Sequence, residues 1–223
     1  MKKIVVTIDG PAGAGKTTVS KRLAEILRYR YVDTGALYRG VAFEARAAGI
    51  NTDDDAALEK LCATLDLNLV LTDKGLRLVS GGKDISDEIR TAEMSMMASA
   101  VSARKVVRDY LLGLQRKLGN EKGVVFEGRD MGTVVFPEAE MKFYLDASPE
   151  VRAYRRYLEM SATKPANLEE VESDLRKRDE NDSSRAIAPL KPAEDAVIID
   201  ATPIRIEGVI DAMMAHINSR LSE

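Results

Sequence analysis

The segment Gly-Pro-Ala-Gly-Ala-Gly-Lys-Thr from Gly10 to Thr17 constrains the chain more than any other stretch. It fits the phosphate-loop pattern G-x-x-x-x-G-K-[ST]. The apolar run 4–8 before it predicts a buried strand, and the apolar spacing over 16–28 after it predicts a helix. Strand, glycine-rich turn and helix in this order indicate a site for a nucleoside triphosphate.

The residue types of this segment explain how it would bind phosphate. Glycines let the backbone curl so that N–H groups point inward at an anion, and the following helix adds the positive end of its dipole. Lys16 is expected to reach the β- and γ-phosphates, and the Thr17 hydroxyl to hold Mg²⁺. The alternative is a glycine-rich turn that only joins a strand to a helix.

Composition narrows the class of protein. The 223 residues suffice for one α/β domain with insertions, and a net charge of -3 disfavours a nucleic-acid-binding role. The single cysteine, Cys62, cannot form an internal disulfide and is expected to be buried. No apolar run approaches the roughly 20 residues that span a membrane, and the N-terminus enters a strand at once. These features predict a cytoplasmic protein. We expect it to be a monomer, although no feature of the sequence reveals the oligomeric state.

Five short apolar segments, separated by predicted helices, indicate a parallel sheet with helices on both faces, that is, an α/β fold. The segments are 4–8, 31–33, 123–127, 142–146 and 196–200. The alternating residues and turn signals over 66–90 predict a small inserted antiparallel sheet. Ligands of parallel sheets bind beyond the carboxyl ends of the strands. The candidates there are 10–17, 33–35, 127–130 and Asp146.

Two groups of charged residues suit phosphate chemistry. Arg129 could bind a phosphate with two hydrogen bonds, and Asp130 could accept from a base amino group; the alternative is an ordinary loop ion pair. Arg178, Asp182 and Arg185 share one face if their helix continues. They suit a mobile lid that closes over phosphates, and the alternative is a solvated ion-pair face.

For other charged and polar residues, the sequence does not decide whether they belong to a binding site. Arg152, Arg155 and Arg156 precede the predicted lid, and the sequence does not say which of them face the triphosphate. Within the helical pattern of 88–119, Ser99 and Arg108 would lie on roughly opposite faces of a straight helix. They could act together only across a break, which Ser102 could supply as an N-cap.

Four motifs together resemble the bacterial cytidylate kinase family, in order and over the whole chain. They are Gly10-Pro-Ala-Gly-Ala-Gly-Lys-Thr-Thr18, Asp33-Thr-Gly-Ala-Leu-Tyr-Arg39, Glu127-Gly-Arg-Asp-Met-Gly-Thr-Val-Val-Phe-Pro137 and Arg178-Asp-Glu-Asn-Asp-Ser-Ser-Arg-Ala-Ile-Ala-Pro189. Asn181 and Ser183 stand where some relatives carry further lid arginines. The resemblance implies transfer of the γ-phosphoryl group of ATP to CMP or dCMP, with Mg²⁺.

The resemblance also implies a P-loop nucleoside monophosphate kinase fold. Its parts would be a core of about 1–59, 101–157 and 187–223, a monophosphate-binding insert of about 60–100 and a helical lid of about 158–186. ATP would contact Gly10, Pro11, Ala12, Gly13, Ala14, Gly15, Lys16, Thr17 and Thr18. CMP would contact Thr34, Arg39, Ser99, Arg108, Arg129, Asp130, Arg178, Asp182 and Arg185. The catalytic residues would be Lys16, Arg129, Arg178 and Arg185, and Glu127 would hold a metal-bound water.

Two alternatives remain at this point. One is a small phosphotransferase acting on another monophosphate or on a metabolite alcohol. The other is a nucleotide-dependent switch, although the guanine-reading Asn-Lys-x-Asp motif is absent from the sequence.

Overall fold

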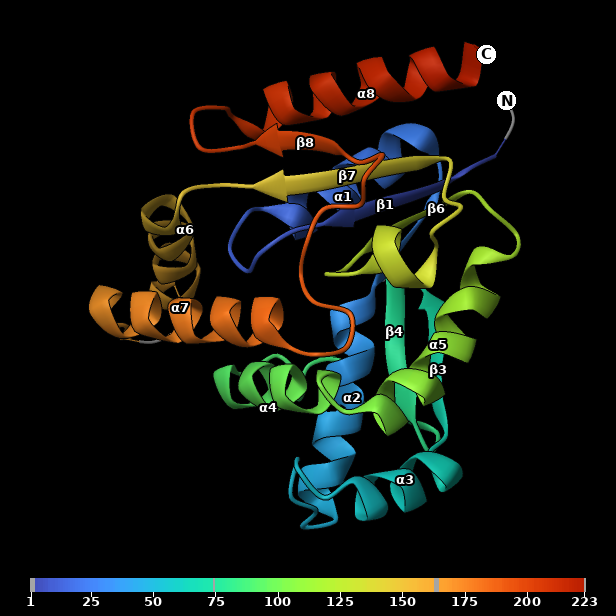
Figure 1. Cartoon of the computed structure of the whole chain (residues 1–223), viewed down its shortest axis with the longest axis vertical. Helices are drawn as coiled ribbons and strands as arrows, with labels where there is room; N and C mark the ends of the chain where they lie inside the picture. Colours follow the sequence, from blue (N-terminus) through green and yellow to red (C-terminus); the bar gives the residue numbers. More distant parts are fainter. Residues whose placement is uncertain (1–2, 74, 163–164, 223) are drawn as a thin grey trace. The chain divides into compact units, whose positions relative to one another are not determined.

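The computed structural model describes residues 3–73, 75–162 and 165–222. Their contacts divide into two compact units. Unit 1 comprises residues 1–31 and 121–223, and unit 2 comprises residues 32–120. Figure 1 labels the helices and strands of both units.

The central sheet has the strand order β2-β6-β1-β7-β8, and the predicted five-stranded parallel sheet is confirmed. The strands are β1 (Val5–Asp9), β2 (Arg30–Asp33), β6 (Val124–Glu127), β7 (Met141–Asp146) and β8 (Val197–Asp200). The last two residues of β2 fall in unit 2. Ile8 lies opposite Glu127, and Asp9 lies opposite Tyr144. The acidic residues that end β1 and β6 therefore lie at the same edge of the sheet.

Alternate strand residues point to opposite faces of the sheet, and helices α1 (Lys16–Leu27) and α8 (Ile206–Ser222) pack on it. Helices α6 (Pro149–Ser161) and α7 (Leu168–Ser184) pack on each other, with Ala153, Val171 and Leu175 in a small apolar cluster with Ala12. On one face, Ile8 and Phe143 join a core with Leu23 of α1 and Met213 of α8, and Figure 1 shows α8 running alongside β8. Pro149 starts α6, with the Ser148 hydroxyl accepting from the Val151 amide.

The segment after β6 contains an element that the sequence does not predict. Met131–Val135 form a five-residue π-helix. Such short insertions have no hydrophobic period that a sequence could reveal, and they occur often at functional sites. The Asp9 carboxylate accepts from the first two amides of this turn, Met131 N at 2.9 Å and Gly132 N at 2.8 Å.

The described residues of unit 2 form four helices and the predicted antiparallel sheet, which is confirmed in the order β3-β4-β5. Its elements are α2 (Thr34–Ala47), α3 (Asp55–Thr64), β3 (Leu67–Thr72), β4 (Gly75–Ser80), β5 (Lys83–Asp84), α4 (Ala92–Ser102) and α5 (Lys105–Gly119). Residue 74, in the turn predicted between β3 and β4, lies outside the described residues. Leu37, Leu58 and Leu111 centre the apolar core of this unit, and Cys62 is buried as expected.

The helical pattern over 88–119 contains the break considered above, but at a different residue. Ser102 is the last residue of α4 and not an N-cap, so that assignment is wrong. Arg104 occupies the N-cap of α5 and makes no side-chain capping bond there. The chain turns at Ala103 and Arg104, where the apolar spacing continues and so conceals the break.

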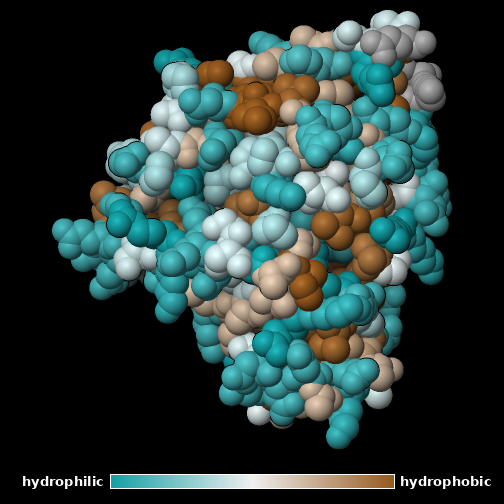
Figure 2. Space-filling view, viewed as in Figure 1, coloured by the Kyte–Doolittle hydropathy of each residue, from teal (hydrophilic) through white to brown (hydrophobic). Residues whose placement is uncertain are grey.

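The visible surface is mostly hydrophilic, with apolar patches over β8 and α8 in unit 1 (Figure 2). Ile198 on β8 and Ile206 on α8 are among the exposed apolar residues. Within the described ranges, every helix is too short or too polar to cross a lipid bilayer.

We expect Leu23→Ala to lower the free energy of unfolding by about 2–5 kcal/mol, because it leaves a cavity in a closely packed core. Ile26→Ala on the same helix removes a side chain that is 44% exposed and should change stability by less than about 0.5 kcal/mol. Urea denaturation of both variants measures the difference. Equal losses would contradict the assignment of the buried face of α1.

Candidate functional site

The loop from Gly10 to Lys16 has a backbone that only glycine allows at key positions. Gly10 has a φ of +145°, and a Cβ there would lie 2.0 Å from the carbonyl oxygen of Leu145. Gly13 and Gly15 also have positive φ. The Lys16 side chain folds back over this curve and is 4% exposed, with Nζ donating to Pro11 O at 2.6 Å. The loop therefore encloses its own cation.

An oxygen-rich group lies where α1 begins. The Thr17 hydroxyl donates to Glu127 Oε1 at 2.8 Å, and the Tyr31 hydroxyl donates to Glu127 Oε2 at 2.6 Å. Since β1 and β6 are parallel neighbours, Glu127 leaves the sheet at the same edge as the glycine loop. Thr17 uses its proton on Glu127, so its oxygen lone pairs are turned elsewhere and could contact a cation.

The charged residues predicted from 129–130 and from the lid meet in unit 1. Arg129 Nε donates to Asp182 Oδ2 at 3.0 Å, and Arg178 Nε lies 3.9 Å from the same oxygen. Arg185 Nη2 lies 3.7 Å from Asp130 Oδ1, and both of these side chains are nearly fully buried. Three arginines and two carboxylates thus share one cluster in which Asp130, Asp182 and Arg185 are buried and Arg129 and Arg178 are half-buried. A solvated helix face would not produce this burial.

Electrostatics at the loop favour an anion. Burial, together with the positive charge of Arg129, lowers the pKa of Lys16 well below its ordinary value. Burial would raise the pKa of Asp182, but the charges of Arg129, Arg178 and Arg185 outweigh it and hold that pKa below its ordinary value. Negative charge arriving near Lys16 would relieve the repulsion among these cations.

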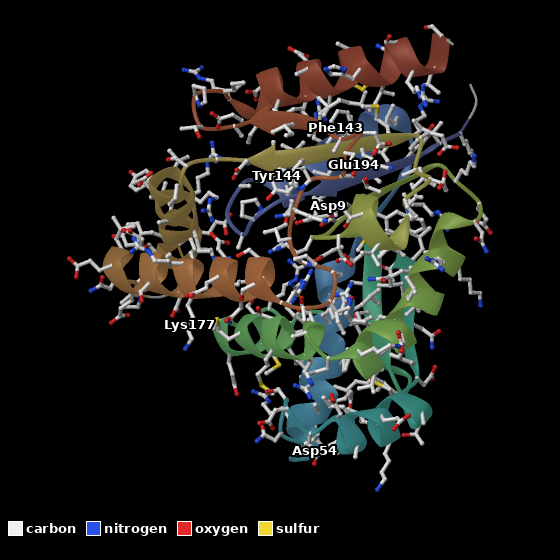
Figure 3. All side chains as sticks on the ribbon, in the orientation of Figure 1. Asp9, Asp54, Phe143, Tyr144, Lys177 and Glu194 are labelled. Carbon is white, nitrogen blue, oxygen red and sulfur yellow. The ribbon has the colours of Figure 1, made fainter. Side chains whose placement is uncertain are left out.

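Asp9 joins the loop to the Arg129–Asp130 segment, and Figure 3 labels it at the end of β1 with Tyr144 on the neighbouring strand. Its carboxylate is buried and accepts from the two amides that open the π-helix. Burial raises its pKa to about 6, even though those two amides lower it. Asp9 therefore sets the path of the chain directly after Asp130.

In unit 2, the start of α2 carries two of the predicted site residues, Thr34 and Arg39. Asp33 caps the helix by accepting from Ala36 N at 3.2 Å, and its second oxygen accepts from Arg39 Nη2 at 2.6 Å. Arg39 thus folds back toward the helix N-terminus, beside the buried Thr34. A cation and a helix N-terminus together form a suitable place for a phosphate group.

The α4–α5 junction brings Ser99 and Arg108 into one buried group. Arg108 Nη1 donates to Ser102 O at 3.2 Å, and the Ser102 hydroxyl donates to Ser99 O at 2.8 Å. The Arg108 guanidinium lies 5.8 Å from the centre of the Tyr38 ring. Ser102 therefore links Arg108 to the backbone of Ser99 across the break.

The predicted site residues therefore form three groups. Unit 1 gathers the loop, Glu127, the Arg129–Asp130 pair and three residues at the end of α7, Arg178, Asp182 and Arg185. Unit 2 holds the group at the start of α2 and the group at the α4–α5 junction.

Sequence reasoning missed Asp9 and Tyr31 and left Arg152 unassigned. A carboxylate directly between an apolar strand and the glycine loop was the available signal for Asp9. Tyr31 and Arg152 act through partners distant in sequence, so no local pattern marks them.

We expect nucleotide binding to take up protons above neutral pH. Lys16 has a lowered pKa without ligand, and adjacent phosphates should raise that pKa, so neutral Lys16 gains a proton on binding. Calorimetric titration of ADP at about pH 8 in buffers of different ionisation enthalpy measures this uptake. Lys16→Arg, whose guanidinium stays protonated, should show less uptake. Equal uptake in both proteins would place the titrating group elsewhere.

Comparisons with known proteins agree with this geometry. Residues 6–219 match the family described as Cytidylate kinase. The chain is 49% identical over 221 residues to the cytidylate kinase of Geobacter sp. (strain M21), covering 99% of this chain and 95% of that protein. It is 50% identical over 218 residues to the cytidylate kinase of Geobacter sulfurreducens, covering 97% and 94%.

Among solved structures, a gluconokinase from Sinorhizobium meliloti 1021 shares the fold, with a TM-score of 0.50 and 15% identity, over 99% of this chain and 96% of that one. The likeness to this gluconokinase shows the fold alone. The family assignment rests instead on relatives that match nearly the whole chain with about half of the aligned residues identical. The chain belongs to the cytidylate kinase family.

Proposed function

We propose that this chain transfers the γ-phosphoryl group of ATP to CMP or dCMP, giving ADP and CDP or dCDP. The observation that carries the proposal is the buried cluster in which Arg129, Arg178 and Arg185 meet two carboxylates. It lies in the unit that holds the glycine loop, and Arg129 is close enough to affect Lys16. Phosphoryl transfer needs cations placed in this way around the moving charge.

The donor nucleotide would bind through main-chain amides of residues 10–18 and through Lys16. Thr17 and Glu127 supply hard oxygen atoms of the kind that Mg²⁺ prefers, and the Thr17 lone pairs are not used on Glu127. These residues fit a Mg²⁺ ion that arrives with the nucleotide and takes most of its ligands from phosphates and water. Bound there, the ion would neutralise charge on the β- and γ-phosphates.

The acceptor would bind through residues that match the motifs of the family position by position. Thr34, Arg39, Arg129 and Arg185 suit its phosphate, and Arg178 and Asp182 suit its ribose. Ser99, Arg108 and Asp130 suit cytosine, whose amino group donates and whose ring nitrogen and oxygen accept. Uracil would face Asp130 with a carbonyl oxygen, and a buried mismatch of this kind discriminates strongly.

The chain needs no covalent nucleophile for this reaction, because an acceptor phosphate oxygen attacks the γ-phosphorus directly. The protein aligns the two substrates and surrounds the transferred group with Lys16 and arginines. A lid of about 158–186 would exclude water that otherwise hydrolyses ATP. The rest of the chain would comprise a core of about 1–59, 101–157 and 187–223 and a monophosphate-binding insert of about 60–100.

A coupled ADP-release assay with CMP, dCMP, UMP and AMP tests the proposal. We expect CMP and dCMP to be the best acceptors, because Asp130 pairs with the exocyclic amino group of cytosine. A preference for UMP or AMP would refute the cytosine assignment. ATP turnover that ignores all four acceptors would favour a different phosphotransferase or a nucleotide switch.

Asp130→Ala should raise KM for CMP by about ten- to a hundredfold, because a charged hydrogen bond to the base is lost. KM for ATP should change much less. Glu138→Ala alters an exposed acid a few residues away and serves as the matched control. Steady-state kinetics with each substrate varied in turn gives both constants, and an equal rise in the two would count against a base-reading role.

A further inference from the structure

Helix α6 places one buried arginine, Arg152, against the outer side of the glycine loop. Its Nη1 donates to Ala12 O at 3.1 Å, and its Nε donates to Ala147 O at 2.9 Å. The side chain is 8% exposed. The approach is so close that a Cβ on Gly13 would lie 2.9 Å from the carbonyl oxygen of Arg152. The loop and the helix are therefore in direct backbone contact at this point.

The bond to Ala12 O bears on which way the loop amides point. A trans peptide is planar, so the carbonyl of Ala12 and the N–H of Gly13 point in opposite directions. A donor that holds Ala12 O on the outside therefore turns Gly13 N–H to the inside, where phosphate would lie. Arg155 acts similarly on the next peptide but one, since its Nη1 donates to Ala14 O at 3.3 Å.

Arg152 also reaches the lid helix. Its Nη1 donates to Asp179 Oδ2 on α7, and this helix carries Arg178 and Asp182 of the charged cluster. The other carboxylate oxygen of Asp179 is buried and has no hydrogen-bond partner in the described part of the chain. One guanidinium thus joins the loop, the end of β7 and α7. The planar guanidinium of arginine holds several N–H donors in fixed directions, so it can bond to all three partners at once, whereas the single ammonium of lysine could not.

We propose that Arg152 is a positioning residue for phosphoryl transfer, which turns the Ala12–Gly13 peptide toward the donor phosphates and ties the loop to Asp179 on α7. Occupancy of the loop is thereby coupled to the placement of Arg178 and Asp182. This inference rests on the proposed function for the identity of the donor. A purely structural arginine would support the fold of α6 without affecting the two substrates differently.

The test compares Arg152→Lys, Asp179→Asn and the double variant with a matched control, Arg156→Lys. Arg156 lies on the same helix, and its ion pair with Glu159 is solvent-exposed. Calorimetry gives Kd for ADP with Mg²⁺ and, separately, for CMP; steady-state assays give kcat. Thermal unfolding records the stability of each variant.

Arg152→Lys should weaken ADP binding by about tenfold or more, because a charged hydrogen bond to the loop is lost, while CMP binding stays within about twofold. Asp179→Asn should lower kcat with little effect on ADP binding, since it cuts only the link to α7. The double variant should be no slower than Arg152→Lys alone. The control should behave like the original protein.

Three outcomes would overturn the proposal: unchanged ADP binding in Arg152→Lys, equal losses for ADP and CMP, or multiplicative losses of kcat in the double variant. If Arg152→Lys does not fold, Asp179→Asn alone tests the link between the loop and α7. The NMR resonance of the Gly13 amide should then shift on removal of the Asp179 charge. An unshifted resonance together with an unchanged kcat would refute that link. ADP binding needs no acceptor, so these results stand even if the acceptor is not CMP.

Discussion

Binding of phosphate by main-chain amides requires that the peptides of a loop face the same way, and much of unit 1 serves this requirement. The carbonyl groups that the loop turns outward need donors of their own. Arg152 and Arg155 donate to two of them, Ala12 O and Ala14 O. Helix α6 and strand β7 press closely enough on the loop that Gly10 and Gly13 cannot carry side chains without displacement. The loop is thus held in shape from its outer side.

The second constraint is the cost of burying cations before any substrate arrives. Arg129 and Arg185 are largely buried, and carboxylates of Asp182 and Asp130 lie beside them. Isolated buried charges are strongly unfavourable, so these acids stabilise the free protein. A phosphate that binds Arg129 must compete with Asp182 for the same guanidinium. Affinity for substrate and stability without substrate are therefore opposed in this cluster.

Most of the fold could be predicted from the sequence, because the patterns that indicate its strands and helices are local and periodic. The five apolar segments and the glycine pattern each lie within a few neighbouring residues, and the structure confirms the elements that they predict. The π-helix at 131–135 and the break at 103–104 left no such signal, because both alter the course of the chain without altering its apolar spacing. Charged pairs distant in sequence, such as Arg152 with Asp179, can be identified only from coordinates.

The role of each predicted site residue rests on the family motifs combined with the local groups observed in each unit. Ser99 and Arg108 show how the two kinds of information differ. Helical spacing alone placed them apart, and the turn between α4 and α5 brings them into one hydrogen-bonded group through Ser102.

The position of the Asp9 carboxylate limits how the acceptor preference could be redesigned. Asp9 stands immediately before Gly10 and also accepts from the amides of Met131 and Gly132. The glycine loop and the segment after Asp130 are therefore both fixed by the end of β1. Lengthening or reshaping the 128–135 segment would remove the Met131 and Gly132 amides from the Asp9 carboxylate. It would thereby also disturb the adjoining glycine loop. Exchanging side chains upon the existing backbone is the route that this architecture leaves open to a protein engineer.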